Sequence, residues 1–106
     1  AYDLASAIES IAPAMGPNST IVPMLNGHAH FATLDARFGA ARVAGGLARI
    51  SGMLGPEGEI LHTGPSGVSF GERNGKPPRP SLVELDAACK KAGIDGLSGL
   101  VIETLL

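Results

Sequence analysis

The sequence has one cysteine, few aromatic residues, no long apolar run and no excess of charge of one sign. Its single cysteine, Cys89, excludes an internal disulfide and fits a reducing compartment. A formal net charge of −2 gives no basic field to attract nucleic acid or an anionic membrane. No apolar run approaches the roughly 20 residues of a membrane-spanning helix, and no secretory signal pattern opens the chain. We therefore expect a cytoplasmic protein without nucleic acid or membrane partners.

The motifs of the common catalytic and metal sites are also missing. The sequence contains no G-x-G-x-x-G, no phosphate-binding P-loop and no cysteine pair for zinc. His28 and His30 are two residues apart, so on a helix they face different ways and are unsuited to share a metal. Ser51 has no evident base partner, and Ser66 lacks the strand-turn-helix setting of a hydrolase nucleophile. We expect no metal site and no catalytic residue of these kinds.

What the chain does have is 15 glycines, 8 prolines and an aliphatic composition in 106 residues, enough for one small domain. Few aromatic residues mean a core of aliphatic side chains and close approaches between backbone segments. The sequence begins without methionine and ends on Leu105-Leu106 inside an amphipathic pattern. We therefore expect it to be a fragment of a longer protein.

The first forty residues predict a helix, a strand and a second helix. Apolar residues recur at helical spacing in two segments: Leu4, Ile8, Ile11 and Met15, and Phe31, Leu34 and Phe38. Gly16 and Gly39 are expected to cap these helices. Residues 20–25 read as a strand, which Pro23 should confine to a sheet edge or a bulge. This order is typical of an α/β fold.

The middle of the chain predicts an antiparallel three-strand meander. Residues 42–53 alternate without helical period, and residues 59–63 and 68–71 continue as two short strands. Turns are expected at residues 55–58 and 64–67, which are rich in glycine and proline. Glu72 ends the third strand and is expected to be solvated.

The last third predicts a loop and C-terminal helices. Residues 73–80 are basic and proline-rich, which indicates a solvated loop or a segment that faces a phosphate. Ser81 and Glu84 fit a capping box. The stripe of the following helix makes Cys89 a core residue rather than a nucleophile: Leu82, Leu85, Ala88, Cys89 and Ala92. A final helix is expected from Ser98 to the end of the chain.

The apolar run Ile21-Val22-Pro23-Met24-Leu25 stops on Asn26-Gly27, which places one polar side chain at the end of a strand. Ligands of open α/β sheets bind at the carboxyl ends of strands, so Asn26 is a candidate site residue. Asn-Gly is also the commonest two-residue turn. Both interpretations stand at this point.

Five segments at matching spacing together resemble the ketopantoate reductase (2-dehydropantoate 2-reductase) family. They are Asn26-Gly27 after the apolar run, then Phe38-Gly39, then R-V-A-G-G-L-A-R-I-S-G-M-L, P-E-G-E-I-L-H-T-G and S-F-G-E. The resemblance implies NADPH-dependent reduction of 2-dehydropantoate to pantoate, on the route to pantothenate and coenzyme A. It implies a partial Rossmann-type unit: residues 1–72 would end the NADP-binding domain, 73–80 would link, and 81–106 would lead into a helical domain.

The resemblance also implies site residues. Asn26 matches the family's asparagine that contacts the cofactor near its nicotinamide side and the substrate region. Gly52 matches a small residue that lies against the cofactor, although packing alone could explain a glycine there. The family's phosphate loop would precede Ala1 and its catalytic lysine would follow Leu106, and Glu72 is not its catalytic acid. We therefore expect no reductase activity from these 106 residues alone.

Two other hypotheses remain open from the sequence. The chain could be a non-catalytic binding or assembly module with a similar α/β layout. It could also come from a related dehydrogenase that acts on a different small 2-hydroxy acid. In each case a truncated sheet would leave apolar faces and strand edges uncovered, so we expect a homo-oligomer.

Overall fold

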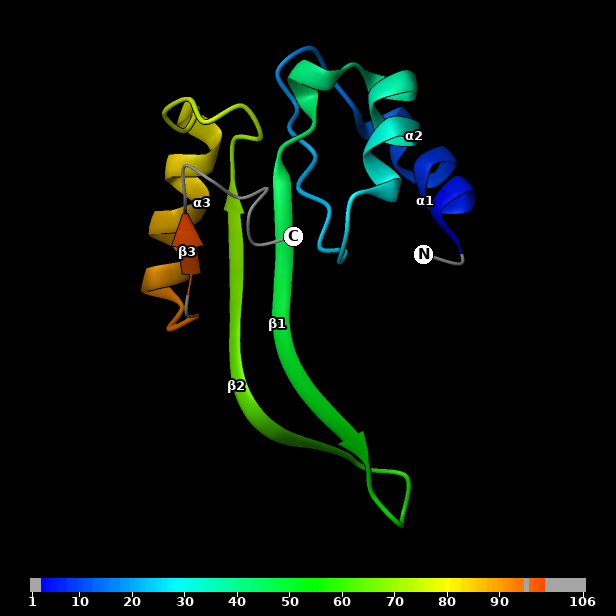
Figure 1. Ribbon diagram of the computed structural model, residues 1–106, viewed down its shortest axis with the longest axis vertical. Helices are drawn as coiled ribbons and strands as arrows, with labels where there is room; N and C mark the ends of the chain where they lie inside the picture. The colour runs from blue at the N-terminus through cyan, green and yellow to red at the C-terminus, as the bar shows by residue number, and fades with distance from the viewer. Residues whose placement is uncertain (1–2, 95, 99–106) are drawn as a thin grey trace.

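The computed structural model describes residues 3–94 and 96–98, and it confirms the predicted α/β class (Figure 1). Helices and strands mix along the chain, with two short 3₁₀ turns, η1 and η2. In chain order the elements are α1 (Leu4–Ile11), η1 (Ala12–Ala14), α2 (Ala29–Phe38), η2 (Ala40–Arg42), β1 (Gly45–Leu54), β2 (Ile60–Gly71), α3 (Pro80–Lys91) and β3 (Gly96–Ser98).

The first core joins α1, α2 and the residue that leads into β1. Its buried members are Ile8, Phe31, Leu34 and Val43, with Leu4 and Phe38 packed against them. The helical stripe predicted for α2 is thus confirmed. The stripe predicted for the first helix is confirmed at Leu4 and Ile8 only, because Ile11 is exposed and Met15 lies beyond α1. Gly39 caps α2 with φ +90°, as expected.

The end of α1 differs from the prediction. The α-helix stops at Ile11 and continues only as the 3₁₀ turn η1. Pro13 has no N–H with which to extend an α-helical ladder, so the chain tightens and then leaves the helix. Gly16 lies beyond this turn without a positive φ, so it is not a left-handed cap.

The second core lies between the hairpin and α3. Ala44, Phe70, Leu82 and Cys89 are buried together, and Val22, Val68 and Leu85 pack against them. Cys89 is therefore a core residue, as predicted. Gly93, with φ +75°, ends α3, and the N–H of Ile94 donates to the carbonyl of Cys89 as in a Schellman motif.

The predicted capping box at Ser81 is wrong. α3 begins two residues earlier than this box implies, at Pro80, and Arg79 holds the N-cap position without a side-chain cap bond. Proline is favoured at the first helical position because its fixed φ already suits the helix. Ser81 is thereby moved inside the first turn, where its hydroxyl bonds to Thr20 Oγ1 at 3.0 Å.

The predicted meander is a long hairpin. β1 and β2 pair antiparallel, and residues 64–67, expected to be a turn, lie within β2. Ile50 pairs with Ser66 whereas Gly52 pairs with His62, so three residues of β2 lie opposite Ser51 alone. The strand absorbs glycine and proline as a bulge rather than as a turn. The third strand is β3, which pairs parallel to β2.

The predicted strand at residues 20–25 is reduced to a single bridge between Ile21 and Val43. The N–H of Ile21 donates to the carbonyl of Arg42, and the carbonyl of Ile21 accepts from Ala44. The next ladder donor would be Pro23, which has no N–H, so the pairing stops there. The segment still runs close to β1, because a Cβ on Gly46 would lie 2.6 Å from the carbonyl oxygen of Pro23.

The hairpin projects from the body formed by the two cores (Figure 1). β1 is buried at its start and exposed from Arg49 onward. The Cα radius of gyration is 14.9 Å, compared with about 13 Å for a compact chain of this length. No helix in the described part of the chain is long and apolar enough to cross a membrane. Most of the helix predicted from Ser98 lies outside the described residues.

Candidate functional site

Asn26 lies in the bend that leads into α2, with its side chain exposed to solvent. His28 is the N-cap of that helix, and Gly27 has φ +80° with no described residue within 4 Å of the position its Cβ would take. Among the described residues, no hydrogen bond holds the side-chain amide of Asn26. Both its donor and its acceptor are therefore available to a ligand.

Gly52 lies on β1 opposite His62, in the exposed half of the hairpin. A Cβ at this position would meet Leu61 O at 3.5 Å and Ile60 Cγ2 at 3.7 Å, which are ordinary contacts. Packing within the described residues therefore does not require glycine here, in contrast to Gly46.

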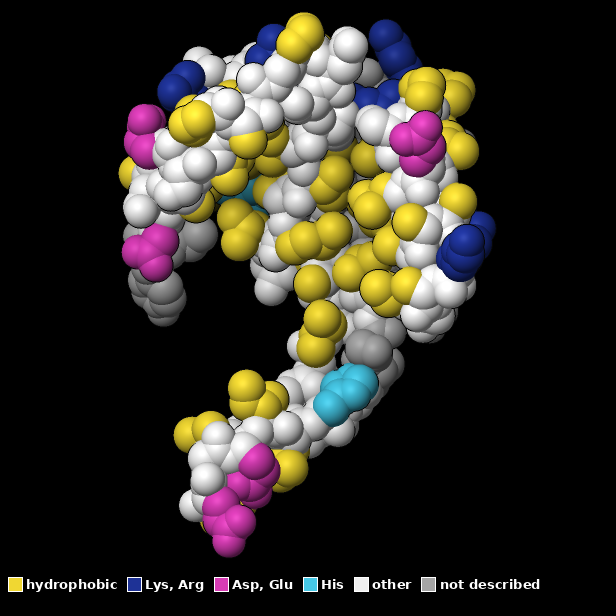
Figure 2. All heavy atoms as spheres, turned by 180° about the vertical axis from the view of Figure 1, so that it is seen from behind, with side chains coloured by type: hydrophobic (Ala, Val, Ile, Leu, Met, Phe, Trp, Pro, Cys, Tyr) yellow, Lys and Arg dark blue, Asp and Glu magenta, His cyan; other side chains and the backbone are white. Residues whose placement is uncertain are grey.

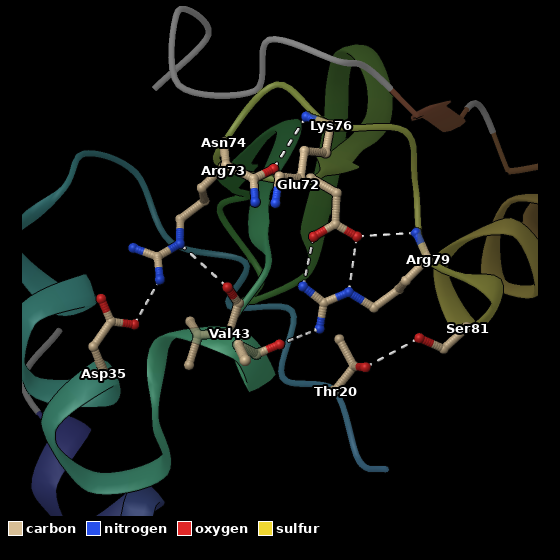
Figure 3. Close-up of polar contacts among 10 residues, drawn as sticks. Thr20, Asp35, Val43, Glu72, Arg73, Asn74, Lys76, Arg79 and Ser81 are labelled. Atoms are coloured by element: carbon tan, nitrogen blue, oxygen red, sulfur yellow. Dashed lines mark hydrogen bonds and ion pairs between the residues drawn. The ribbon is translucent and has the colours of Figure 1, made fainter.

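Glu72 and Arg79 form a buried ion pair at the two ends of the loop between β2 and α3 (Figure 3). Glu72 Oε1 lies 2.5 Å from Arg79 Nη2, and Oε2 accepts from Arg79 Nε at 2.8 Å and from its backbone N–H at 3.0 Å. Arg79 Nη1 also donates to the carbonyl of Ala41 at 2.6 Å. The expectation that Glu72 is solvated is wrong, because its side chain is only 8% exposed.

Arg73 turns the other way and ties the same loop to α2 (Figure 3). Its Nη2 lies 2.6 Å from Asp35 Oδ1, and its Nε donates to the carbonyl of Val43 at 3.2 Å. The guanidinium also stacks 4.5 Å from the centre of the Phe31 ring. The basic loop is thus solvated only between its two arginines, at residues 74–78.

The side chains of the two ion pairs line a hollow of about 330 Å³: Asp35, Glu72, Arg73 and Arg79, together with Ala40, Ala41, Val43 and Asn74. The hydrogen bond from Arg79 holds the pKa of Glu72 below its usual range and raises the pKa of Arg79. A carboxylate held in this way is a poor proton acceptor at neutral pH. The cluster therefore orders the loop rather than carrying out acid-base chemistry.

A second hollow of about 510 Å³ lies on the other side of Arg79, between the segment before β1 and the start of α3. Its polar lining includes Ser19, Thr20, Arg42, Ser81 and Glu84. The hydrogen bond between Thr20 and Ser81 closes one wall. Whether the basic loop faces a phosphate stays a prediction.

The two histidines of α2 are in different environments. His28 is exposed, whereas His30 is buried against the Phe31 ring at 4.3 Å between ring centres. Its Nε2 finds no partner among the described residues. Burial lowers the pKa of His30, and the positive charges of His28 and Arg73 add to the effect. Within the described residues no three metal-binding side chains cluster.

Sequence reasoning missed the clusters of Glu72 with Arg79 and of Arg73 with Asp35. One signal was available, since a glutamate and an arginine bracket the Pro-rich loop seven residues apart. Arg73 and Asp35 are thirty-eight residues apart along the chain, so no local sequence pattern predicts their contact. The contact of Arg73 with Asp35 follows from the hairpin, which returns the end of β2 beside the residues before β1.

The sequence model described as "Ketopantoate reductase PanE/ApbA" matches residues 1–75. A curated relative, the uncharacterized oxidoreductase YkpB of Bacillus subtilis (strain 168), is 43% identical over 77 residues. The match covers 72% of this chain and 25% of the relative. Residues 1–75, which the family model matches, include Asn26, the hairpin and Glu72.

Solved structures support the same relationship. The 2-dehydropantoate 2-reductase from Geobacter metallireducens GS-15 is 27% identical with a TM-score of 0.75, over 93% of this chain and 33% of its own. The corresponding enzyme from Methylococcus capsulatus is 29% identical with a TM-score of 0.73, over 95% of this chain and 32% of its own. The chain therefore spans between a quarter and a third of the relatives it matches.

Proposed function

Because the chain belongs to the ketopantoate reductase family, we propose that it is part of an NADPH-dependent reductase that converts 2-dehydropantoate to pantoate. The observation that carries the proposal is the family match over residues 1–75, which includes the candidate residues Asn26 and Gly52. Solved structures that carry the name 2-dehydropantoate 2-reductase support it over more than nine-tenths of the chain. Such a reaction would serve pantothenate and coenzyme A synthesis in the cytoplasm.

The residues present fit one part of a nicotinamide dinucleotide. The side chain of Asn26 is exposed and its amide is not bonded to another described residue, as a ligand contact requires. Packing within the described residues does not require glycine at position 52, which supports a flat group lying against that stretch of β1. When bound, NADPH would supply hydride to the ketone carbon, and Asn26 would bind and orient the nicotinamide end.

The phosphate groups of the cofactor need a different part of the protein. Dinucleotides are held by a glycine-rich turn at a helix N-terminus, and the sequence contains no such motif. We therefore propose that these 106 residues supply the nicotinamide-side contact only. On their own they should show no measurable oxidation of NADPH.

A substrate screen tests the proposal. The protein would be a longer polypeptide that carries this chain within the full length typical of its relatives. We expect rapid NADPH oxidation with 2-dehydropantoate and little with pyruvate or 2-oxoglutarate. Equal rates with several 2-keto acids, or none with 2-dehydropantoate, would contradict it.

One observation favours a second candidate. The curated relative at 43% identity is named only as an oxidoreductase, whereas the named reductases are 27% and 29% identical. A related dehydrogenase for another small 2-hydroxy acid is therefore the alternative. The same screen separates the two, because this enzyme would prefer a different keto acid.

A further inference from the structure

We propose that Asn26, which precedes Gly27 in the bend before α2, is a site of spontaneous deamidation. The reaction replaces its neutral side-chain amide with a negatively charged carboxylate. The chemistry needs an exposed asparagine, a mobile side chain and a following residue that offers no steric barrier. Three asparagines occur in the chain, at positions 18, 26 and 74. They differ in the features that govern this reaction.

The reaction balances without any partner except water. The backbone nitrogen of Gly27 attacks Cγ of Asn26, a C–N bond forms, and the side-chain nitrogen leaves as ammonia. The resulting five-membered succinimide is then opened by water at either carbonyl. The products are aspartate or isoaspartate, each with a carboxylate in place of the amide.

Gly27 is well suited to this attack. It has no Cβ to hinder the approach of its nitrogen, and no described residue lies within 4 Å of the position that a Cβ would occupy. Among the described residues, neither the amide of Asn26 nor the N–H of Gly27 has a hydrogen bond to break first. The ring can therefore form without disturbing α1, α2 or the cores.

Asn74-Gly75 offers the same dipeptide in a restrained setting. Asn74 Oδ1 accepts a hydrogen bond from the N–H of Lys76 at 3.0 Å, which holds the side chain in an Asx turn. The ion pair of Glu72 with Arg79 clasps the two ends of the same loop (Figure 3). Ring closure at Asn74 thus requires prior opening of this loop. Asn18 precedes Ser19, whose Cβ hinders attack.

The consequence for the cofactor rests on the proposed function, whereas the modification itself does not. A carboxylate at position 26 would lose the donor nitrogen and would repel an anionic dinucleotide. The fold should tolerate the charge, because position 26 lies two residues before the N-cap His28 of α2, where negative charge is favourable. Conversion would therefore reduce cofactor binding without unfolding the protein.

Peptide mass mapping of the chain, incubated for days at mildly alkaline pH, tests the site. We expect Asn26 to convert about tenfold faster than Asn74, since a tenfold difference needs only about 1.4 kcal/mol of opening free energy. Isoaspartate should appear at position 26, and Asn26→Gln should abolish conversion there. Gly27→Ala should slow it and Gly75→Ala should leave it unchanged. Equal or faster conversion at Asn74, or no conversion at Asn26, would overturn the proposal.

A second arm uses the longer polypeptide with and without NADPH. Saturating NADPH should slow conversion at Asn26 severalfold and leave Asn74 unaffected. If Asn26 converts at the same rate with the cofactor bound, its placement beside the cofactor is wrong while the deamidation site stands. Absence of conversion with normal reductase activity would overturn the site alone.

Discussion

At the scale of single residues, the ion pair of Glu72 with Arg79 is expected to contribute to the free energy of unfolding. Glu72→Gln would break its ion pair with Arg79, whose guanidinium is only a quarter exposed. Removing one partner of a buried pair leaves the other uncompensated. Because Arg79 keeps some contact with water and with the carbonyl of Ala41, we expect a loss of about 2 kcal/mol in the free energy of unfolding.

Urea denaturation would measure this loss. The matched control is Glu57→Gln, the same chemical change at an exposed residue of the hairpin turn. The control should stay within about 0.5 kcal/mol of the parent. If Glu72→Gln loses no more free energy of unfolding than Glu57→Gln, the ion pair of Glu72 with Arg79 does not stabilise the loop.

The lowered pKa of His30 leads us to expect a loss of stability on mild acidification. Its pKa in the folded chain lies below the ordinary value of 6.5, so the unfolded chain takes up the proton first as the pH falls. The free energy of unfolding should therefore decrease from about pH 6.5 downward, as proton linkage requires. Glu72, whose pKa is also lowered from 4.5, adds a further loss only below that value.

Melting temperatures between pH 7.5 and pH 5 would show the effect. His30→Phe should flatten the profile in this range, and His62→Gln, at an exposed position of the hairpin, should leave it sloping. A His30→Phe profile parallel to that of the parent would show that another group causes the acid sensitivity.

At the scale of elements, replacing each of two glycines of β1 by alanine is expected to affect stability differently. Gly46→Ala would place a Cβ 2.6 Å from the carbonyl oxygen of Pro23, so the segment around Ile21 must shift, at a cost of about 2 kcal/mol. Gly52→Ala meets only ordinary contacts and should change stability by no more than about 0.5 kcal/mol. Thermal denaturation of both variants compares them directly, and a larger loss for Gly52→Ala would contradict this packing.

The same elements show how far the sequence could predict the fold. Regular spacing predicted α2, β1 and the buried positions Leu82 and Cys89 of α3, because periodic burial leaves a local pattern. Ala88 and Ala92, predicted for the same stripe, are exposed. The strand at residues 20–25 was overestimated because Pro23 lacks the N–H for the next ladder bond. Residues 64–67 look like a turn, but long-range pairing with β1 absorbs them as a bulge.

The candidate site also combines residues that the sequence predicted with contacts that only the structure shows. Asn26 was a candidate because it follows an apolar run, and a family resemblance that the comparisons confirm supplied its role and added Gly52. Their contacts with a cofactor stay predictions. The ion pair of Glu72 with Arg79 joins the two ends of one loop, whereas the contact of Arg73 with Asp35 depends on how the hairpin returns to the body. A contact between residues so far apart in the chain has no periodic signature in a single sequence.

At the scale of the whole molecule, the hairpin exposes apolar side chains away from the body. Figure 2 shows hydrophobic side chains in the hollow of the molecule and along the projecting arm. Leu54 and Ile60 are opposite one another near the tip and are 73% and 84% exposed. Such a surface favours association, so we predict that the chain forms dimers or larger oligomers through this arm.

Light scattering at increasing protein concentration measures that association. Leu54→Glu combined with Ile60→Lys should keep the hairpin, because opposite charges across two strands attract, and should yield monomers. Val83→Lys, at an exposed position of α3, is the control and should still associate. A parent chain that stays monomeric at high concentration would contradict the prediction.

The central claim is that Asn26 contacts the nicotinamide side of NADPH. The most direct measurement is the dissociation constant of NADPH for the longer polypeptide, by quenching or enhancement of the cofactor's fluorescence. We predict that Asn26→Ala weakens binding about tenfold, as expected when one hydrogen-bonding side chain is lost, and that Asn74→Ala does not weaken it. An Asn26→Ala variant that binds NADPH as tightly as the parent would contradict the account.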